Sequence, residues 1–243
     1  MEVQINPIAG ELQRFYDKNT QKYELCIDEV GRGCLFGRVY VACVILPKDP
    51  NLFSGKDIKD SKRFSSKKKM RDVSNYIKSN SVYHISFVDE TVIDEINILQ
   101  AVMKGMHDCI KQITENNSFS TNDCMAIIDG NYFTPHISYD TETETLVELP
   151  HVTIEQGDAK FMGIAAASIL AKVARDDYVL ELCKQHPELS EKYGIHKNMG
   201  YGTKQHLDGI REHGITQWHR KTFGICKQAK VFRTTEKDPP VSI

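Results

Sequence analysis

Three short apolar segments of this chain, residues 25–27, 126–128 and 152–154, each lead into acidic residues close to a glycine. Short apolar runs rich in β-branched residues and bounded by turn formers are typical of strands covered on both faces. The acidic residues that follow them are Asp28, Glu29, Asp129 and Asp158. Because α/β sheets gather functional groups at the ends of their strands, we expect these four side chains to meet at one edge of a sheet.

Helical and extended patterns alternate along the rest of the chain, which predicts an α/β architecture with helices covering a central sheet. Further strands are predicted at residues 39–46 and 82–88, and helices at 65–79, 89–110, 161–183 and 204–212. With 243 residues, 40% of them hydrophobic, the chain can bury one large core. We therefore expect an N-terminal extension at 1–20, a main domain at 21–235 whose part from about 193 is a basic helical lobe, and a tail at 236–243.

Four carboxylates gathered at strand ends would repel one another and resist ionising together. A bound divalent cation removes that repulsion, and hard carboxylate oxygens suit Mg²⁺ or Mn²⁺ rather than zinc. Two such ions can activate water and stabilise the attacking and leaving oxygens of a phosphodiester. A single carboxylate in such a place is more often a turn former or a helix cap, so it is the repetition at three segments that favours a metal site.

The charges of the chain are unevenly distributed, although its net charge is only −2. Residues 86–158 hold fourteen acidic residues and two lysines, whereas residues 192–233 hold nine Lys or Arg and two acidic residues. A second basic stretch, residues 56–71, holds eight Lys or Arg and two Asp. An acidic region beside basic ones is what a metal site facing a phosphate backbone requires, but solvated helix faces can segregate in the same way.

The seven cysteines are scattered and form no C-x-x-C pair, which argues against a zinc site or a disulfide framework. No apolar run approaches the roughly 20 residues that span a bilayer, and residues 1–23 lack the apolar stretch of a secretory signal. We therefore expect a protein that has no membrane partner and is not secreted. Its expected location is the cytoplasm, or the nucleus if the source is a eukaryote.

Seven motifs, in order along residues 23–230, resemble those of bacterial-type ribonuclease HII, a member of the type 2 ribonuclease H family. Any one of these short pieces could match by chance, but seven in the right order are specific. The motifs are Asp28-Glu29-Val30-Gly31-Arg32-Gly33, Asp60-Ser61-Lys62, Asp94-Glu95-Ile96-Asn97-Ile98-Leu99, Ile128-Asp129-Gly130-Asn131, Gly157-Asp158 leading to the helix motif at 166–176 (AASILAKVARD), Gly200-Tyr201-Gly202-Thr203-Lys204-Gln205-His206, and His219-Arg220-Lys221-Thr222-Phe223-Gly224.

This resemblance implies a ribonuclease H-like fold, with a mixed central sheet flanked by helices and a small C-terminal helical lobe. It makes residues 21–235 a type 2 ribonuclease H catalytic domain. It also implies that Asp28, Glu29, Asp129 and Asp158 are both the metal ligands and the catalytic residues. They would hold two Mn²⁺ or Mg²⁺ ions during catalysis.

The same resemblance implies a substrate-binding role for the turn Gly31, Arg32 and Gly33, whose backbone would contact the 2′-hydroxyl of a ribonucleotide. Small residues suit this role because a side chain would keep the strand away, and the 2′-hydroxyl is the group that distinguishes RNA from DNA. Tyr201 would stack on the sugar at the RNA–DNA junction. The alternative for Tyr201 is a half-buried core tyrosine.

Three basic residues in the resembling motifs, Lys62, Lys172 and Arg175, are candidates for contacts with substrate phosphates. Lys172 and Arg175 lie one turn apart on one predicted helix, so either could pair with Asp158 or Asp176 instead.

Other motif residues receive weaker assignments. Arg220 and Lys221 are further candidates for contacts with the nucleic-acid backbone. His206 and His219 are explained by packing or turn hydrogen bonds, and no histidine is assigned to catalysis.

The chain departs from the family directly after its glycine turn. Cys34, Phe36 and Arg38 stand where the family usually has proline and small residues, and Asn198-Met199 lengthens the loop before Gly200. These departures bear on loop geometry and substrate preference rather than on the metal site. Arg32 favours ribonuclease HII over its HIII relatives, which typically carry lysine there.

The expected function is that of an endoribonuclease that hydrolyses the RNA strand of RNA–DNA hybrids. It would also nick 5′ of ribonucleotides embedded in duplex DNA and leave a 3′-hydroxyl and a 5′-phosphate. It would act as a monomer on hybrids and on ribonucleotide-containing duplex DNA, removing misincorporated ribonucleotides and primer RNA. Two alternatives remain: a ribonuclease HIII-like hybrid nuclease, which would need a longer run of RNA, and a non-catalytic hybrid-binding subunit of the same fold.

Overall fold

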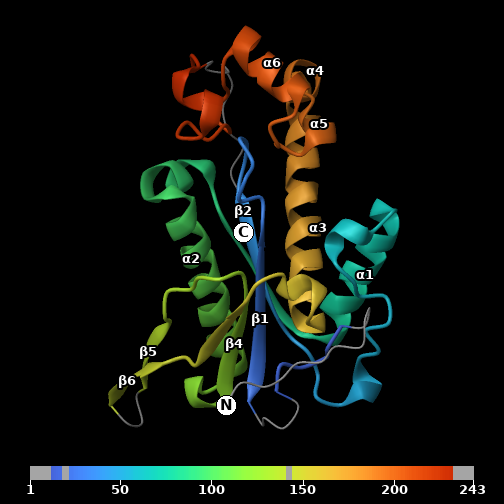
Figure 1. Ribbon diagram of the computed structural model, residues 1–243, viewed down its shortest axis with the longest axis vertical. Helices are drawn as coiled ribbons and strands as arrows, with labels where there is room; N and C mark the ends of the chain where they lie inside the picture. The colour runs from blue at the N-terminus through green and yellow to red at the C-terminus, as the bar shows by residue number, and fades with distance from the viewer. Residues whose placement is uncertain (1–11, 18–21, 141–143, 232–243) are drawn as a thin grey trace.

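A five-stranded mixed sheet forms the centre of the computed structural model, with strand order β3-β2-β1-β4-β7 (Figure 1). The model describes residues 12–17, 22–140 and 144–231, so most of the predicted extension at 1–20 and all of the tail at 236–243 lie outside the described residues. The strands of this sheet are β1 (Tyr23–Val30), β2 (Val39–Ile45), β3 (Val82–Val88), β4 (Cys124–Asp129) and β7 (His151–Ile154).

The pairing of the strands places the ends of β1, β4 and β7 at the same edge. β1 pairs antiparallel with β2 and parallel with β4, and β4 pairs parallel with β7. β2 pairs antiparallel with β3. The mixed sheet that the sequence predicted is therefore confirmed, and the three segments that carry the acidic residues all point the same way.

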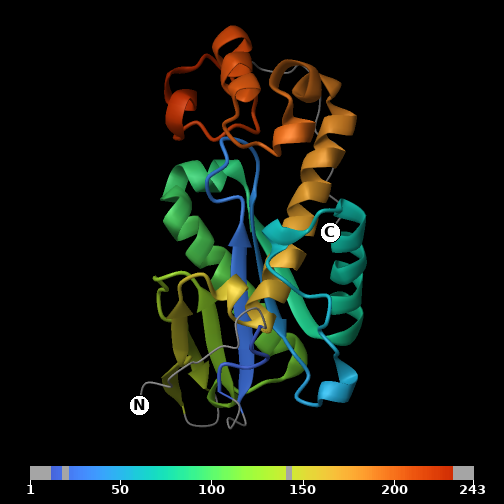
Figure 2. The ribbon, with the colours of Figure 1, turned by 45° about the vertical axis from the view of Figure 1, so that its right-hand side comes forward.

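Helices cover both faces of the sheet, with α2 on one face and α1 and α3 on the other (Figures 1 and 2). β2 is buried along its whole length, and its side chains alternate between the two cores. Val41 packs on the α2 side and Ala42 on the side of α1 and α3. The helices are α1 (Lys67–Asn80), α2 (Glu90–Asn117), α3 (Met162–Gln185), α4 (Pro187–Tyr193), α5 (Ile195–Asn198) and α6 (Lys204–His213).

α3 approaches the sheet closely because its first turns contain Gly163 and the alanines at 165–167. A Cβ atom at Gly163 would collide with the side chain of Cys26 in β1. The alanines at positions 165–167 are fully buried against the same face. The predicted helix at 161–183 is confirmed as α3.

α2 begins as the sequence predicts, because the Asp89 carboxylate accepts a hydrogen bond from the Val92 N–H at 3.0 Å. The helix is, however, interrupted at Asn97, whose φ of 66° and ψ of 165° are not helical. The Asn97 side chain accepts hydrogen bonds from the N–H groups of Leu99 and Gln100 and so caps the second segment. The prediction of one continuous helix was wrong at this point.

The C-terminal lobe lies beyond one end of the sheet and consists of α4, α5, α6 and the 3₁₀ turn η5 (Gly224–Gln228) (Figure 2). It has its own core, which includes Tyr193, Trp218 and the fully buried Phe36. Phe36 belongs to the loop between β1 and β2, so this loop joins the lobe to the sheet. The small helical lobe was predicted, whereas α4 and the helical turn α5 were not.

A hairpin, the cysteines and several 3₁₀ turns complete the described fold. A hairpin of β5 (Ile137–Asp140) and β6 (Thr145–Glu148), which was not predicted, leaves the sheet between β4 and β7. All seven cysteines are buried, and none forms a disulfide. Among the described residues, no helix is long and apolar enough to cross a membrane. The remaining 3₁₀ turns are η1 (Pro50–Leu52), η2 (Ser61–Arg63), η3 (Thr121–Asp123) and η4 (Gly157–Ala159).

Candidate active site

Acidic residues from three strand ends meet at one edge of the sheet. Asp28 lies near the end of β1, and Asp129 ends the neighbouring parallel strand β4. Asp129 lies opposite Ile154 at the end of β7, so the turn η4, which contains Asp158, follows at the same edge. Glu29 is next to Asp28 in the chain. The structure therefore brings the four predicted carboxylates into one neighbourhood.

The four carboxylates interact electrostatically. Burial raises the pKa of Asp28 well above its usual range, and the charges of Asp129 and Glu29 raise it further. Burial also raises the pKa of Asp129, and the charge of Asp158 adds to this. Burial raises the pKa of Glu29 to about 7, although Arg32 opposes the shift. The cluster thus holds more negative charge than its own surroundings stabilise.

Each carboxylate has a hydrogen-bond or ion-pair partner from the chain itself. Asp28 Oδ1 accepts from the Glu29 N–H at 2.7 Å, and Asp129 Oδ1 accepts from the Gly157 N–H at 2.6 Å. Lys62 Nζ lies 3.2 Å from Asp158 Oδ2, and Arg32 Nη1 lies 3.6 Å from Glu29 Oε1. These partners compensate part of the repulsion within the cluster.

The chemistry of this cluster fits Mg²⁺ or Mn²⁺, because its donors are carboxylate oxygens and its negative charge is in excess. As the side chains lie, however, no three His, Cys, Asp or Glu side chains in the described ranges are grouped so that they could hold a metal ion. Metal binding would therefore require these carboxylate side chains to move closer together.

The turn Gly31-Arg32-Gly33 follows directly after β1 and the cluster. Gly31 has a φ of 97°, and a Cβ atom there would collide with the Arg175 side chain. A second arginine, Arg220, reaches the turn from the C-terminal lobe. Its Nη2 and Nη1 atoms donate to the carbonyl oxygens of Gly31 at 2.8 Å and Arg32 at 2.9 Å. The side chains of Arg175 and Arg220 therefore both contact the turn on its buried side.

Arg175 and Lys172 do not present free cations to a phosphate. The fully buried Arg175 guanidinium donates to the carbonyl oxygens of Phe36, Arg38 and Met199. This burial corrects the expectation of a phosphate contact, because all three of its nitrogens already bind backbone. Lys172 Nζ lies 2.7 Å from Asp176 Oδ1, which is the alternative pairing that the sequence left open.

Lys62 differs from these two residues because its side chain is exposed. It extends from the turn η2 to Asp158. The hydrogen bond to Asp158 raises the pKa of Lys62 more than burial lowers it. A cation on an exposed side chain beside the carboxylates can be released to a substrate phosphate.

Tyr201 lies on the loop between α5 and α6, next to the glycine turn. Its side chain is 44% exposed, so it is available to a ligand rather than buried in the core. Backbone hydrogen bonds tie this loop to the turn, since the Leu35 N–H donates to the Gly200 carbonyl at 2.9 Å. The Tyr201 carbonyl lies 2.9 Å from His206 Nδ1.

His206 belongs to a buried histidine pair that the sequence assigned to packing or turn hydrogen bonds. His206 Nε2 lies 3.1 Å from His219 Nε2, and His219 Nδ1 accepts from the Thr216 N–H at 3.0 Å. Burial lowers the pKa of His219 to about 3 and also lowers the pKa of His206, so both rings are neutral at pH 7. The pair connects the Tyr201 loop to the lobe. The sequence signal for this role is that both histidines lie in the motifs that resemble the family, at 200–206 and 219–224.

The residues that depart from the family after the glycine turn contact the surrounding elements. Cys34 is fully buried, with its Sγ atom 3.7 Å from the Met199 carbonyl. The Arg38 guanidinium lies over the rings of Phe87 and Tyr178, at 4.0 and 4.5 Å from their centroids. These residues therefore stabilise the loop between β1 and β2 and do not enter the carboxylate cluster.

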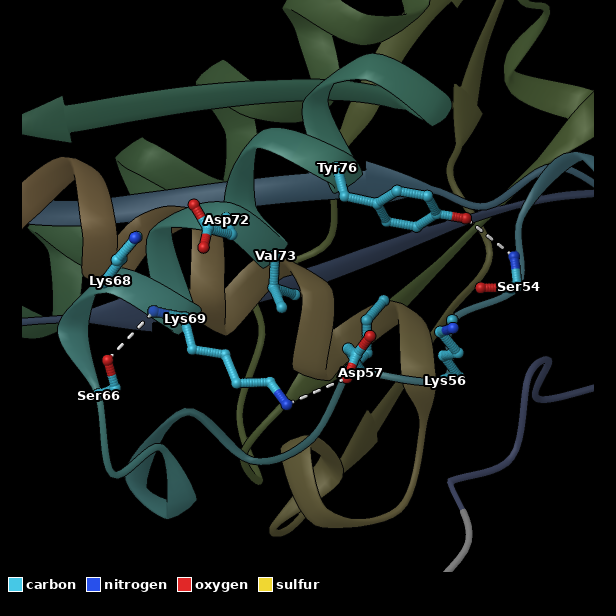
Figure 3. Close-up of a pocket in the computed structure, with 11 residues that line it drawn as sticks. Ser54, Lys56, Asp57, Ser66, Lys68, Lys69, Asp72, Val73 and Tyr76 are labelled. Atoms are coloured by element: carbon cyan, nitrogen blue, oxygen red, sulfur yellow. Dashed lines mark hydrogen bonds and ion pairs between the residues drawn. The ribbon is translucent and has the colours of Figure 1, made fainter.

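A cavity of about 530 Å³ lies elsewhere, between the loop at 54–58 and α1 (Figure 3). Lys69 forms an ion pair with Asp57 across it at 3.3 Å, and the Tyr76 hydroxyl accepts from the Ser54 N–H at 2.9 Å. None of the four carboxylates lines this cavity, so it belongs to a different surface from the candidate active site.

Comparison with solved structures supports the fold. Ribonuclease HII from Archaeoglobus fulgidus, solved in a complex with PCNA, superimposes with a TM-score of 0.61 at 21% identity, covering 84% of this chain and 96% of that one. Ribonuclease H2 from Pyrococcus horikoshii superimposes with a TM-score of 0.60 at 18% identity, covering 84% and 95%. Bst-RNase HIII in complex with Mn²⁺ gives a TM-score of 0.58 at 16% identity, covering 80% and 64%. These likenesses confirm the predicted ribonuclease H-like fold.

Sequence comparison gives the family. The family model described as ribonuclease HII matches residues 25–226. The ribonuclease HII of Parabacteroides distasonis is 41% identical over 209 residues, covering 86% of this chain and 94% of that protein. The ribonuclease HII of Flavobacterium psychrophilum is 36% identical over 222 residues, covering 87% and 95%. The chain therefore belongs to the ribonuclease HII family of endonucleases, the hydrolases that act on RNA–DNA hybrids.

Proposed function

We propose that this protein nicks duplex DNA on the 5′ side of an embedded ribonucleotide, in addition to cutting the RNA strand of hybrids. The products would be a 3′-hydroxyl and a 5′-phosphate. The observation that supports this proposal is the position of the carboxylate cluster beside a glycine turn whose backbone is open to a ligand. The cluster supplies the chemistry, and the turn supplies a means of sensing ribose.

Asp28, Glu29, Asp129 and Asp158 are proposed to hold two divalent cations, Mn²⁺ or Mg²⁺. Such ions would activate water and stabilise charge on the attacking and leaving oxygens of the phosphodiester. The chain's own part is to fix the carboxylates on three strand ends and to bury them, which strengthens their interaction with cations and with the substrate. No Ser, Cys or His nucleophile is needed.

Substrate recognition is proposed to involve three further groups. Gly31, Arg32 and Gly33 would contact the 2′-hydroxyl through the backbone, and the exposed ring of Tyr201 would stack on the junction sugar. Lys62 would leave Asp158 and contact a substrate phosphate once cations neutralise the carboxylates. Lys172 could do the same only by leaving Asp176.

The proposed biological role is the removal of misincorporated ribonucleotides and of primer RNA, by a monomer. A ribonuclease HIII-like preference for longer RNA is less well supported, because Arg32 stands where HIII relatives typically carry lysine. A non-catalytic hybrid-binding subunit would be expected to lack at least one of the four carboxylates.

The test is a cleavage assay in Mg²⁺ or Mn²⁺ that compares an all-DNA duplex, a duplex with one ribonucleotide and a full RNA–DNA hybrid. Asp129→Asn should abolish cleavage of both ribonucleotide-containing substrates while the far-UV circular dichroism stays unchanged. Asp123→Asn is the matched control, since Asp123 is an exposed carboxylate beside the opposite end of β4. Native cleavage by Asp129→Asn would refute the metal assignment, and no nick at a single ribonucleotide would favour the HIII-like alternative.

A further inference from the structure

Two fully buried arginines lie behind the glycine turn and bind only backbone carbonyl groups. Arg175 extends from α3, and Arg220 from the segment between α6 and η5. Between them their nitrogens bind six carbonyl oxygens, all at 2.8 to 3.1 Å, those of Gly31, Arg32, Phe36, Gly37, Arg38 and Met199. Five of these six carbonyls belong to the segment that runs from the glycine turn to β2.

Neither arginine has a carboxylate partner. Within the described part of the chain, no ion pair within 4.0 Å joins Arg175 or Arg220 to an acidic side chain. Burial lowers the pKa of Arg220 to about 10, and the distant Glu90 and Asp94 compensate only in part. The guanidinium therefore remains charged at neutral pH. A buried cation without a counter-ion is costly for folding, which indicates that Arg220 serves a function.

The hydrogen bonds from Arg220 fix the direction in which the turn presents its N–H groups. In a planar trans peptide the C=O and the following N–H point in opposite directions. Because the carbonyls of Gly31 and Arg32 point inward to Arg220, the N–H groups of Arg32 and Gly33 point away from it. Both residues are exposed, and neither N–H donates to an acceptor within the described residues.

We propose that Arg220, assisted by Arg175, is a positioning residue that orients the N–H groups of Arg32 and Gly33 toward the 2′-oxygen of the substrate and so determines ribose selectivity. The two buried positive charges add an attractive potential behind these donors. This inference rests on the proposed function of the same site. It assigns to Arg220 a role that differs from a direct contact with the nucleic-acid backbone.

The test compares binding rather than turnover, with Ca²⁺ in place of the catalytic cation. Fluorescence anisotropy gives the Kd for a duplex with one ribonucleotide and for the same duplex made only of DNA. Arg220→Lys keeps the charge but loses the planar fork that binds three carbonyls. We expect the ratio of Kd values, that of the all-DNA duplex divided by that of the ribonucleotide duplex, to fall about 10- to 100-fold, the strength of two ordinary hydrogen bonds. The Kd for the all-DNA duplex should change little.

Arg14→Gln is the matched control for a merely structural effect. Arg14 also donates to backbone carbonyls, those of Phe53 and Pro47, but it does so beyond the opposite end of β2. This variant should lower the thermal stability while leaving the ratio of Kd values unchanged. If Arg220→Lys keeps the wild-type ratio, or if Arg14→Gln lowers it equally, the inference is overturned.

Two measurements keep the proposal testable if Arg220→Lys does not fold. Arg175→Lys examines the same support from α3 and should lower the ratio in the same direction. In the wild-type protein, amide hydrogen exchange at Arg32 and Gly33 should be fast without ligand and slowed by the ribonucleotide duplex but not by the all-DNA duplex. Equal slowing by both duplexes would overturn the inference. Failure of the wild type to prefer either duplex, or to cleave at the ribonucleotide, would refute the proposed function instead.

Discussion

Replacing Glu29 by glutamine should stabilise the metal-free protein at alkaline pH, although it removes a proposed metal ligand. Burial raises the pKa of Glu29 from its ordinary value of 4.5 to about 7, with Asp129 adding to the shift and Arg32 opposing it. The folded protein therefore binds this proton more tightly than the unfolded chain does. The stability that the protonated carboxyl contributes is complete below pH 4.5 and is lost as the pH rises through 7.

The size of the effect follows from the two pKa values. A rise from 4.5 to about 7 corresponds to about 3 kcal/mol at 1.36 kcal/mol for each pKa unit. The conversion is appropriate because the Glu29 side chain is only 15% exposed. This figure already includes the ion pair with the half-exposed Arg32, because that ion pair opposes the shift. The gain at pH 8 should thus be about 3 kcal/mol, or about 6 to 12 °C in Tm for a chain of this size.

The assay is thermal unfolding in EDTA at pH 8 and at pH 4.5, followed by circular dichroism. Glu29→Gln should raise Tm at pH 8 and have little effect at pH 4.5. Glu115→Gln, at an exposed carboxylate of α2, is the matched control and should change Tm little at either pH. Added Mn²⁺ should stabilise the wild type more than Glu29→Gln. A Tm at pH 8 that does not rise, or a gain of equal size at pH 4.5, would refute the reasoning.

Two further predictions concern the histidine pair and the exposed lysine. Burial lowers the pKa of His219 from 6.5 to about 3, so the stability that its neutral ring contributes is complete above pH 6.5 and decreases as the pH falls toward 3. Between pH 8 and pH 5, urea unfolding should therefore show a loss in the free energy of unfolding that is about 2 kcal/mol smaller in His219→Asn than in the wild type. An equal loss in both proteins would contradict this. Lys62→Gln should weaken binding of all duplexes alike in Ca²⁺ and lower the slope of log Kd against log salt by about 1, whereas an unchanged slope would mean that Lys62 stays on Asp158.

The sheet and its acidic edge could be predicted because their signals are local. A buried strand needs only a short apolar run, and the acidic residues follow three such runs directly or, for Asp158, four residues later. Asp129 could be placed from the four residues before it and the glycine after it. The break in α2 could not be predicted in this way, because the apolar spacing of Ile93, Ile96 and Leu99 continues across Asn97. The side chain of Asn97 decides the local geometry there.

The roles of the buried arginines could not be predicted because they depend on contacts distant in sequence. Arg220 binds carbonyls 183 to 189 residues away, and Arg175 binds two carbonyls that are 137 and 139 residues away. A basic residue in a motif that resembles those of a nuclease family predicts an exposed phosphate contact, which is why both residues were assigned to the substrate. Only the packing of the lobe against the loop between β1 and β2 distinguishes a buried arginine from an exposed one.

The site as a whole combines two arrangements that are each unfavourable for the isolated protein. The carboxylate cluster holds excess negative charge, and the turn beside it has two buried arginines without acidic partners. Divalent cations would neutralise the carboxylates, and a phosphodiester would interact favourably with the positive charge of the arginines. Because each ligand also carries the charge that attracts the other, binding of the cations and of the nucleic acid should be mutually strengthening. The affinity for Mn²⁺ should accordingly rise when a ribonucleotide duplex is bound, and by the same factor the affinity for the duplex should rise with Mn²⁺.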